Sequence, residues 1–350
     1  AVFQYDGVGW GGFLCGVVGF FPGGIAKRGL RCDGNPHPIR SHPEMPGAEI
    51  RNAMDALAET VADSDVLLDV ADLEVEFHTG AGVVRAVDGV SFQLRRGEFL
   101  AIVGESGCGK SVTALSLMRL LPRKTAHVKA TRIMFDGRDI SKLPESEMRA
   151  LRGRHMSMIF QEPMTSLNPV LTIGDQLTEP LLTHLDMTRE QADARAVELL
   201  GMVGIPEPER RLTQYPHQFS GGMRQRAMIA IGLACEPTLI IADEPTTALD
   251  VTIQAQILEL LKDISDRLGI AVILITHNLG VVAAYADRVN VMYAARIIER
   301  GPALDIFAKH AHPYTIGLMR SVPRLDKPRV GRLATIEGMP PNLLAPPVGC

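Results

Sequence analysis

Residues 104–111 read Gly-Glu-Ser-Gly-Cys-Gly-Lys-Ser, and this octet constrains the fold more than any other part of the chain. It matches the pattern G-x-x-x-x-G-K-[ST] and lies between an apolar run at residues 99–103 and a segment of helical spacing at residues 111–121. Strand, loop and helix in this order are the context in which the pattern binds phosphate. The glycines allow successive backbone amides to face an anion, and the helix N-terminus adds positive partial charge. The octet therefore predicts a nucleotide-binding α/β fold.

Side chains within this loop have distinct expected roles. Lys110 is expected to reach the β- and γ-phosphates of a nucleoside triphosphate, and Ser111 to place its hydroxyl on Mg²⁺. Cys108 has two readings. It is either a small residue that fits beside the phosphates, which we favour, or a reactive thiol, because a helix N-terminus lowers a thiol pKa. Under both readings, alkylation of Cys108 should block nucleotide binding and ATP should protect it. The predicted nucleotide-binding residues of the loop are Gly104, Glu105, Ser106, Gly107, Cys108, Gly109, Lys110 and Ser111.

Polar residues follow two later apolar strands. Asp243 and Glu244 come directly after residues 239–242, and His277 follows residues 273–276. Ligands of open α/β sheets bind at the carboxyl ends of the strands. We expect Asp243 in the Mg²⁺ shell, Glu244 as the general base for the attacking water, and His277 hydrogen-bonded to the γ-phosphate and that water. An acidic pair at a strand end is often only solvated and a lone histidine is often structural, but the preceding phosphate loop favours function here.

The wider pattern is strand and helix in alternation on both sides of a helical stretch at about residues 172–234. This alternation predicts a mostly parallel sheet with helices on its faces. Residues 67–77 are expected to form a half-buried strand and residues 83–94 a strand pair. Thr188 and Gln191 form a predicted capping box. Asp250 is the expected N-cap of a helix through Leu268, closed by Gly269.

Composition excludes some classes of protein. The net charge of −4 argues against a basic nucleic-acid footprint, and the five cysteines are too scattered for a disulfide framework, which fits a reducing, cytoplasmic setting. Residues 1–65 are expected to be a disordered or non-native extension, with Met54 as a more normal start. Within them, residues 7–26 are apolar but contain eight glycines, so a leader is favoured over a membrane segment.

A second helix start has the character of an anion site. Ser220 is the natural N-cap of a helix, and Gly221 and Gly222 leave bare amides at its N-terminus. The simplest interpretation is an ordinary capped helix. The octet at residues 219–226, Phe-Ser-Gly-Gly-Met-Arg-Gln-Arg, nevertheless resembles the signature motif of ABC-transporter ATPases.

The order of motifs resembles that family over about residues 67–301. The resemblance implies a P-loop NTPase fold: an ABC ATPase domain at residues 66–300 with a RecA-like core, an antiparallel β subdomain and an α-helical insert at about 162–235. A C-terminal extension covers residues 301–350. Gln161 resembles the Q-loop glutamine, which touches Mg²⁺ and water and senses the transmembrane partner, and Asp250 resembles the D-loop aspartate. Two such domains pack head to tail, so the partner's ATP would be contacted by Ser220, Gly221, Gly222 and Gln225.

One expected feature of the family is missing. Its members usually stack the adenine on an aromatic residue ahead of the phosphate loop, and that position falls near residues 81–85, which contain no aromatic residue. Phe77 is the expected substitute.

Further motifs resemble the ATPases of dipeptide and oligopeptide importers: residues 161–169, residues 215–226, the sequence His-Pro-Tyr-Thr at 312–315, and the tail at 336–341 and 346–350. Nickel-uptake and some glycoside-uptake relatives share much of this pattern. In such relatives the tail often continues into a cysteine cluster for an iron–sulfur centre. Cys350 looks like its first cysteine, but one thiolate cannot hold a four-ligand cluster, so we expect a chain truncated there.

The resemblance implies an ATP- and Mg²⁺-dependent motor at the cytoplasmic face of a bacterial inner membrane. Its implied partners are a second ABC ATPase subunit, a paralogue in the relatives, two transmembrane permease subunits and an external peptide-binding protein, with no nucleic acid. One alternative is a motor for nickel or another small solute. Another is a soluble ABC ATPase of DNA repair or translation, although no coiled-coil arm, zinc module or basic stretch is visible. A catalytically dead regulatory subunit disagrees with the intact Lys110, Asp243, Glu244 and His277.

Overall fold

The computed structural model describes residues 65–247, 249–321, 336 and 338–345. The chain divides into two units, residues 1–53 and 54–350, and every described residue belongs to the second. The predicted leader up to residue 64 and Cys350 lie outside the described residues. Within the described ranges, none of the helices combines the length and the apolar character needed to cross a lipid bilayer.

A six-stranded sheet lies at the centre, in the order β11-β10-β3-β9-β8-β7. The strands from β10 to β7 are parallel, and β11 pairs antiparallel to β10 at one edge. Every residue of β3, β8 and β9 is buried, as expected for apolar runs covered on both faces of a parallel sheet. The strands are β3 (Phe99–Val103), β7 (Met156–Ile159), β8 (Leu239–Asp243), β9 (Ala271–Thr276), β10 (Arg288–Tyr293) and β11 (Arg296–Pro302).

A second sheet is antiparallel and has the order β2-β1-β5-β6, with β4 also paired to β1. Its first two strands form one long hairpin, from the pair Val66 and Arg95 to the pair Thr79 and Gly82. The prediction of a strand pair at residues 83–94 is therefore wrong, because this segment is a single strand whose partner is β1. The strands are β1 (Val66–Thr79), β2 (Gly82–Arg95), β4 (Ala126–Lys129), β5 (Arg132–Phe135) and β6 (Arg138–Asp139).

The helix after the phosphate loop, α2 (Lys110–Leu117), is shorter than the predicted 111–121. The chain leaves the helix because Arg119 adopts a left-handed conformation, with φ of 51°. Its guanidinium donates a hydrogen bond to the carbonyl of Leu143 (2.6 Å), a contact far along the chain that helical spacing does not indicate.

The helical stretch between β7 and β8 agrees with the prediction. Thr188 and Gln191 form the predicted capping box at the start of α6. After β8, Asp250 caps α9 as predicted, and this helix ends at a left-handed Gly269. The helices are α3 (Glu145–Leu151), α4 (Pro163–Ser166), α5 (Ile173–His184), α6 (Arg189–Met202), α7 (Pro208–Leu212), the 3₁₀ helix η1 (Pro216–Gln218), α8 (Gly221–Leu233), α9 (Val251–Leu268) and α10 (Leu279–Tyr285).

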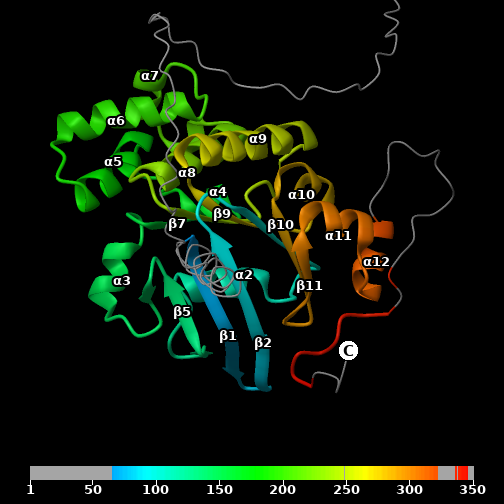
Figure 1. The fold of residues 1–350 in the computed structure, drawn as a ribbon. Coiled ribbons are helices and arrows are strands. Elements are labelled where there is room, and N and C mark those ends of the chain that lie inside the picture. Colours follow the sequence, from blue (N-terminus) through cyan, green and yellow to red (C-terminus); the bar gives the residue numbers. More distant parts are fainter. Residues whose placement is uncertain (1–64, 248, 322–335, 337, 346–350) are drawn as a thin grey trace, which may run out of the picture. The chain divides into compact units, whose positions relative to one another are not determined.

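Alternate residues of the parallel strands face two different cores. In β9, Val272 and Leu274 join the core built with α5, α6, α8 and α9, whereas Ile273 and Ile275 face α2 and the antiparallel sheet. The parallel sheet is therefore the middle layer of this unit, with the helical stretch on one face and the hairpin of β1 and β2 on the other (Figure 1).

The C-terminal extension continues beyond residue 302 with regular secondary structure. It forms α11 (Ala303–Lys309) and α12 (Pro313–Ser321), which pack with α10 on β3 and β10. Further on, the carbonyl of Leu343 accepts a hydrogen bond from the Arg85 amide (3.4 Å). The sequence did not indicate these two helices, because both are short and depend on their tertiary contacts.

Candidate functional site

Four neighbouring parallel strands end at one edge of the central sheet. β3 leads into residues 104–111, β7 leads to Gln161, β8 ends at Asp243, and β9 is followed by His277. Because carboxyl ends of parallel strands lie side by side, residues separated by more than 170 positions in sequence meet here. The structure thus brings together the phosphate loop, the acidic pair, the glutamine and the histidine that the sequence singled out.

The phosphate loop needs glycine for space as well as for conformation. Gly104 and Gly109 have φ of 154° and 105°, and Gly107 has φ of 82°. A Cβ at Gly104 would lie 2.2 Å from the Met292 carbonyl oxygen, and one at Gly109 would lie 2.3 Å from that of Ala86. The loop is therefore packed directly on the backbone of its neighbours, which fixes the direction of its amides.

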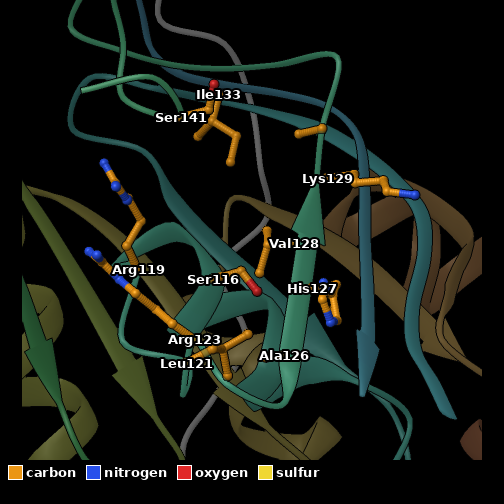
Figure 2. A pocket seen from close by; sticks show the side chains of 11 residues that line it. Ser116, Arg119, Leu121, Arg123, Ala126, His127, Val128, Lys129, Ile133 and Ser141 are labelled. Atoms are coloured by element: carbon orange, nitrogen blue, oxygen red, sulfur yellow. The ribbon is translucent and has the colours of Figure 1, made fainter. Parts of the chain in front are cut away.

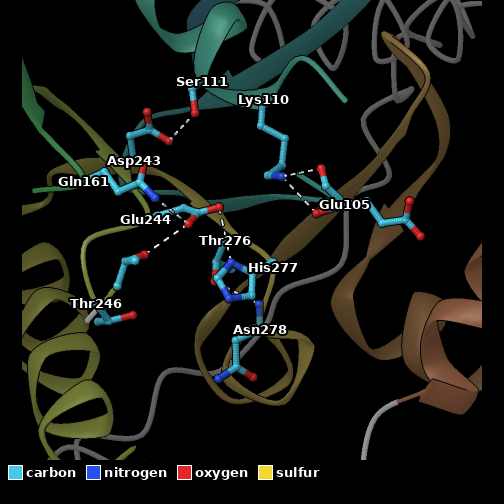
Figure 3. Close-up of polar contacts among 12 residues, drawn as sticks. Glu105, Lys110, Ser111, Gln161, Asp243, Glu244, Thr246, Thr276, His277 and Asn278 are labelled. Atoms are coloured by element: carbon cyan, nitrogen blue, oxygen red, sulfur yellow. Dashed lines mark hydrogen bonds and ion pairs between the residues drawn. The ribbon is translucent and has the colours of Figure 1, made fainter. Parts of the chain in front are cut away.

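Lys110 and Ser111 are already oriented by hydrogen bonds. The buried Lys110 Nζ donates to the carbonyls of Gly104 (2.9 Å) and Glu105 (2.8 Å). The Ser111 hydroxyl donates to Asp243 Oδ1 at 2.9 Å. Burial raises the pKa of the Asp243 carboxyl, and the hydrogen bond from Ser111 opposes this rise. The serine and the aspartate, predicted to share a metal ion, are therefore in direct contact (Figure 3).

Glu244 is the centre of a second set of contacts. Its Oε2 accepts hydrogen bonds from Gln161 Nε2 (3.0 Å) and the Thr247 hydroxyl (3.1 Å), and its Oε1 lies 3.3 Å from His277 Nδ1 (Figure 3). The residue has a left-handed φ of 45°, and its amide is held by the Ile275 carbonyl at 2.9 Å. Non-glycine residues in this conformation are strained and cluster at functional sites. The left-handed backbone conformation directs the carboxylate away from the strand and toward Gln161 and His277.

Gln161 and Glu244, together with the phosphate loop, border a cavity of about 220 Å³. Its lining joins the amide-rich loop, an ammonium group, a hydroxyl and a carboxylate, which is the chemistry that a magnesium nucleotide requires. Of the residues predicted to meet the nucleotide, Gly104, Glu105, Cys108, Asp243 and His277 are absent from the lining, and no residue of the Ser220 helix start contributes to it. The lining residues are Ala86, Ser106, Gly107, Gly109, Lys110, Ser111, Val112, Gln161 and Glu244.

A larger cavity, of about 410 Å³, lies between the end of α2 and the strands β4 and β5 (Figure 2). Two arginines line it, but both are engaged elsewhere. Arg119 donates to the carbonyls of Ile140 and Leu143, and Arg123 forms an ion pair with Glu145. The smaller cavity therefore remains the candidate functional site.

Cys108 fits the interpretation as a small packed residue. Its side chain is buried, and burial raises the pKa of its thiol although Lys110 lies close enough to lower it. The reactive-thiol alternative finds no support, because the thiolate is the nucleophile and a raised pKa reduces its population.

We expect Cys108 to react with iodoacetamide at least about tenfold more slowly in the folded chain than in the unfolded chain at pH 7.5. Because burial raises the pKa of the thiol, the rate should rise with pH at a higher pH than it does for a free thiol, and complete modification should still abolish nucleotide binding. Peptide mapping by mass spectrometry measures both rates on the same protein. Equal rates in the two states would contradict the buried, protonated thiol.

The signature helix is only partly as predicted. Ser220 caps α8, its hydroxyl accepting from the Met223 amide (3.3 Å), and it is exposed, as is Gly221. Gln225 differs, because it is fully buried and its amide atoms have no hydrogen-bond partner among the described residues. A buried side chain cannot contact a nucleotide held by another molecule, so the structure removes Gln225 from the predicted contact set.

The adenine-stacking role expected of Phe77 stays a prediction. Phe77 packs on the core between the two sheets and does not line the cavity. Arg85 lies opposite Glu76 across the strand pair and directs its guanidinium to that residue (3.2 Å). The sequence analysis missed three residues of the site. Ala86 and Val112 line the cavity and gave no signal. Thr247, which bonds Glu244, belongs to the motif compared with the D-loop and was passed over in favour of Asp250.

The described residues fit a magnesium ion at one place. Mg²⁺ prefers oxygen ligands from one or two protein groups and the phosphates of its substrate. The Ser111 hydroxyl and the Asp243 carboxylate supply this type of donor at a distance of 2.9 Å from each other. Among the described residues there is no group of three or more histidine, cysteine, aspartate or glutamate residues that would suit a metal on its own. The Cys350 prediction for an iron–sulfur cluster lies outside the described residues.

The fold and this cavity together define a P-loop ATPase of the ABC class. Residues 87–247 match the family model described as ABC transporter, and residues 298–350 match that of the oligopeptide/dipeptide transporter C-terminal region. A solved structure of the ATP-binding cassette MJ0796, a dimer in a post-hydrolysis state bound to ADP and Pi, superposes with a TM-score of 0.60. It is 28% identical and covers 67% of this chain and 98% of its own.

Characterised relatives specify the family further. The dipeptide transport ATP-binding protein DppD of Bacillus subtilis is 58% identical over 284 residues, covering 81% of this chain and 84% of DppD. The oligopeptide transport ATP-binding protein OppD of Salmonella typhimurium is 52% identical over 299 residues, covering 84% and 88%. This chain belongs to the family of peptide ABC transporter ATP-binding proteins.

Proposed function

We propose that this chain hydrolyses Mg-ATP to drive the import of dipeptides or oligopeptides through an ABC transporter. The observation that supports peptide as the cargo is the match of residues 298–350 to the oligopeptide/dipeptide transporter C-terminal region, in a chain that also has the nucleotide cavity. DppD and OppD, whose names state dipeptide and oligopeptide transport, extend over most of the same chain.

The proposed roles follow from the contacts in the cavity. The loop amides and Lys110 bind the phosphates, and the Lys110 ammonium exchanges its bonds to the loop carbonyls for bonds to phosphate oxygens. Ser111 and Asp243 would hold Mg²⁺, with Gln161 beside them. When bound, the ion would neutralise charge on the phosphate oxygens.

Glu244 is the proposed general base. Its carboxylate accepts bonds from Gln161 and Thr247, which fix its orientation, and it is only partly exposed to solvent. His277, 3.3 Å from the same carboxylate, is placed to hydrogen-bond the attacking water or the γ-phosphate. A base held in this way takes the water proton as the oxygen attacks phosphorus.

The proposed assembly follows the same family. Ser220, Gly221 and Gly222 would contact the nucleotide of a second ATPase subunit, and Asp250 would lie at the contact between the subunits. The remaining partners are two permease subunits and an external peptide-binding protein, which places this chain at the inner face of the bacterial plasma membrane. The ATPase domain spans residues 66–300, with the helical insert at about 162–235, and the extension begins at residue 301.

A transport assay tests the proposal. The chain is purified from membranes with its co-purifying permease subunits, reconstituted into proteoliposomes with ATP inside, and supplied with the matching binding protein. We expect labelled dipeptide or oligopeptide to accumulate only with ATP and to stimulate phosphate release several-fold. The matched control is the same complex carrying Glu244→Gln.

Other outcomes separate the alternatives. Uptake of Ni²⁺ or of a glycoside without uptake of peptide would overturn the cargo while leaving the ATPase in place. Recovery of nucleic acid instead of permease subunits would overturn the transport function itself.

A further inference from the structure

Tyr314 belongs to the His-Pro-Tyr-Thr sequence, for which the proposed function has no role. It lies in the first turn of α12, and its side chain is 7% exposed. Its ring packs against Tyr293 at the end of β10, with the ring centroids 4.4 Å apart. Its hydroxyl accepts a hydrogen bond from the backbone amide of Glu105, the second residue of the phosphate loop, at 3.1 Å. A side chain of the C-terminal extension thus holds a backbone group of the nucleotide site.

The start of α12 is itself held in place. Glu299 of β11 accepts hydrogen bonds from the amides of Ala311 (2.7 Å) and His312 (3.3 Å), and His312 Nδ1 accepts the Tyr314 amide (3.1 Å). Burial raises the pKa of the Tyr314 phenol, so the hydroxyl remains neutral. The acceptor offered to the loop is therefore a fixed, protonated phenol.

Few other hydrogen bonds hold the backbone of the phosphate loop. The Cys108 carbonyl accepts from the Ala295 amide at 3.1 Å, and Lys110 bonds the carbonyls of Gly104 and Glu105. A triphosphate competes with these carbonyls for the Lys110 ammonium. When the lysine turns to the phosphates, the Ala295 and Tyr314 contacts remain to keep the loop backbone in its curled form.

We propose that Tyr314 is a positioning residue for the phosphate loop, through which α12 of the C-terminal extension sets the affinity of the site for Mg-ATP. The Glu105 amide is committed to this contact and does not face the phosphates, which differs from the predicted role of Glu105 in nucleotide binding. Preorganising the loop lowers the ordering cost of binding, so its loss weakens ATP binding more than it changes the chemical step. The inference concerns the nucleotide and holds whichever solute is transported.

The test is Tyr314→Phe in the full chain, which removes the hydroxyl and keeps the ring packed against Tyr293. We expect Kd and KM for Mg-ATP to rise about fivefold, the effect of one hydrogen bond, with kcat within about twofold of the unmodified chain. Equilibrium binding, steady-state phosphate release and thermal unfolding are measured on the same preparations.

Tyr293→Phe is the matched control, because it makes the same chemical change in the neighbouring ring, whose hydroxyl has no hydrogen bond to the loop in the described part of the chain. Its Kd and KM should stay unchanged. Glu299→Ala, which removes the support of the α12 start, should raise KM in the same direction as Tyr314→Phe.

Unchanged Kd and KM in Tyr314→Phe would overturn the proposal. A large fall in melting temperature with KM unchanged would also overturn it, since that result assigns the tyrosine to packing alone. Loss of peptide uptake bears on the cargo and leaves this test unaffected.

Discussion

Glu244→Gln should leave Mg-ATP binding intact and slow hydrolysis by about 100-fold or more. The amide retains the size of the carboxylate and can still bond Gln161 and Thr247, but it cannot accept the proton of the attacking water. Phosphate release measures turnover, and equilibrium titration measures binding. Because product formation reopens the sites, the variant should also accumulate with its partner subunit as a stable dimer in ATP, which size-exclusion chromatography detects.

The control for this variant is Glu259→Gln, the same chemical change on the exposed surface of α9. It should retain full turnover. Asp243, the neighbouring carboxylate, is a poor substitute base because the Ser111 hydroxyl already occupies one of its oxygens. Near-normal hydrolysis in Glu244→Gln would therefore contradict the assignment of the base and direct attention to His277.

Lys110→Ala should weaken Mg-ATP binding by about 100-fold or more. The lysine is 4% exposed, and its ammonium has the Gly104 and Glu105 carbonyls as partners. Hydrogen bonds between an ammonium and phosphate oxygens contribute about 1.5–3 kcal/mol each, and two of them account for the expected loss. Titration with a fluorescent ATP analogue measures the affinity, and circular dichroism confirms that the variant folds.

Lys142→Ala is the corresponding control, since this lysine is highly exposed and pairs only with Asp139 on the surface. Its affinity for nucleotide should equal that of the unmodified chain. An affinity for Mg-ATP within a few-fold of normal in Lys110→Ala would show that the loop amides suffice to bind the phosphates. The buried position of the Lys110 ammonium would then need another explanation.

The sequence predicted the parts of the fold that local chemistry determines. The strand at residues 99–103, the Thr188 capping box and the α9 caps are all confirmed, because each depends on an apolar run or on residues three or four positions apart. The α/β class and the family are also confirmed. The convergence of Lys110, Glu244 and His277 followed from a general rule, that ligands bind where parallel strands end.

Tertiary contacts determined what the sequence could not predict. Gln225 is polar and near the exposed Ser220, but it lies on the inward face of α8, where its amide has no hydrogen-bond partner in the described part of the chain. Phe77 is aromatic, yet pairing in β1 directs it to the core. Tyr314 follows the phosphate loop by about 200 residues, and only the docking of α12 brings its hydroxyl to Glu105. Residue type and spacing along the chain carry no information on such distant contacts.

Calorimetric titration of the purified full chain with ATP in excess Mg²⁺ measures the central claim most directly. If the loop amides, Lys110 and the Ser111–Asp243 pair form the nucleotide site, one equivalent of ATP should bind per chain, and omission of Mg²⁺ should weaken binding. A folded chain that gives no binding heat at millimolar ATP, and retains no labelled nucleotide on filtration, would contradict the ATPase and the transport function together.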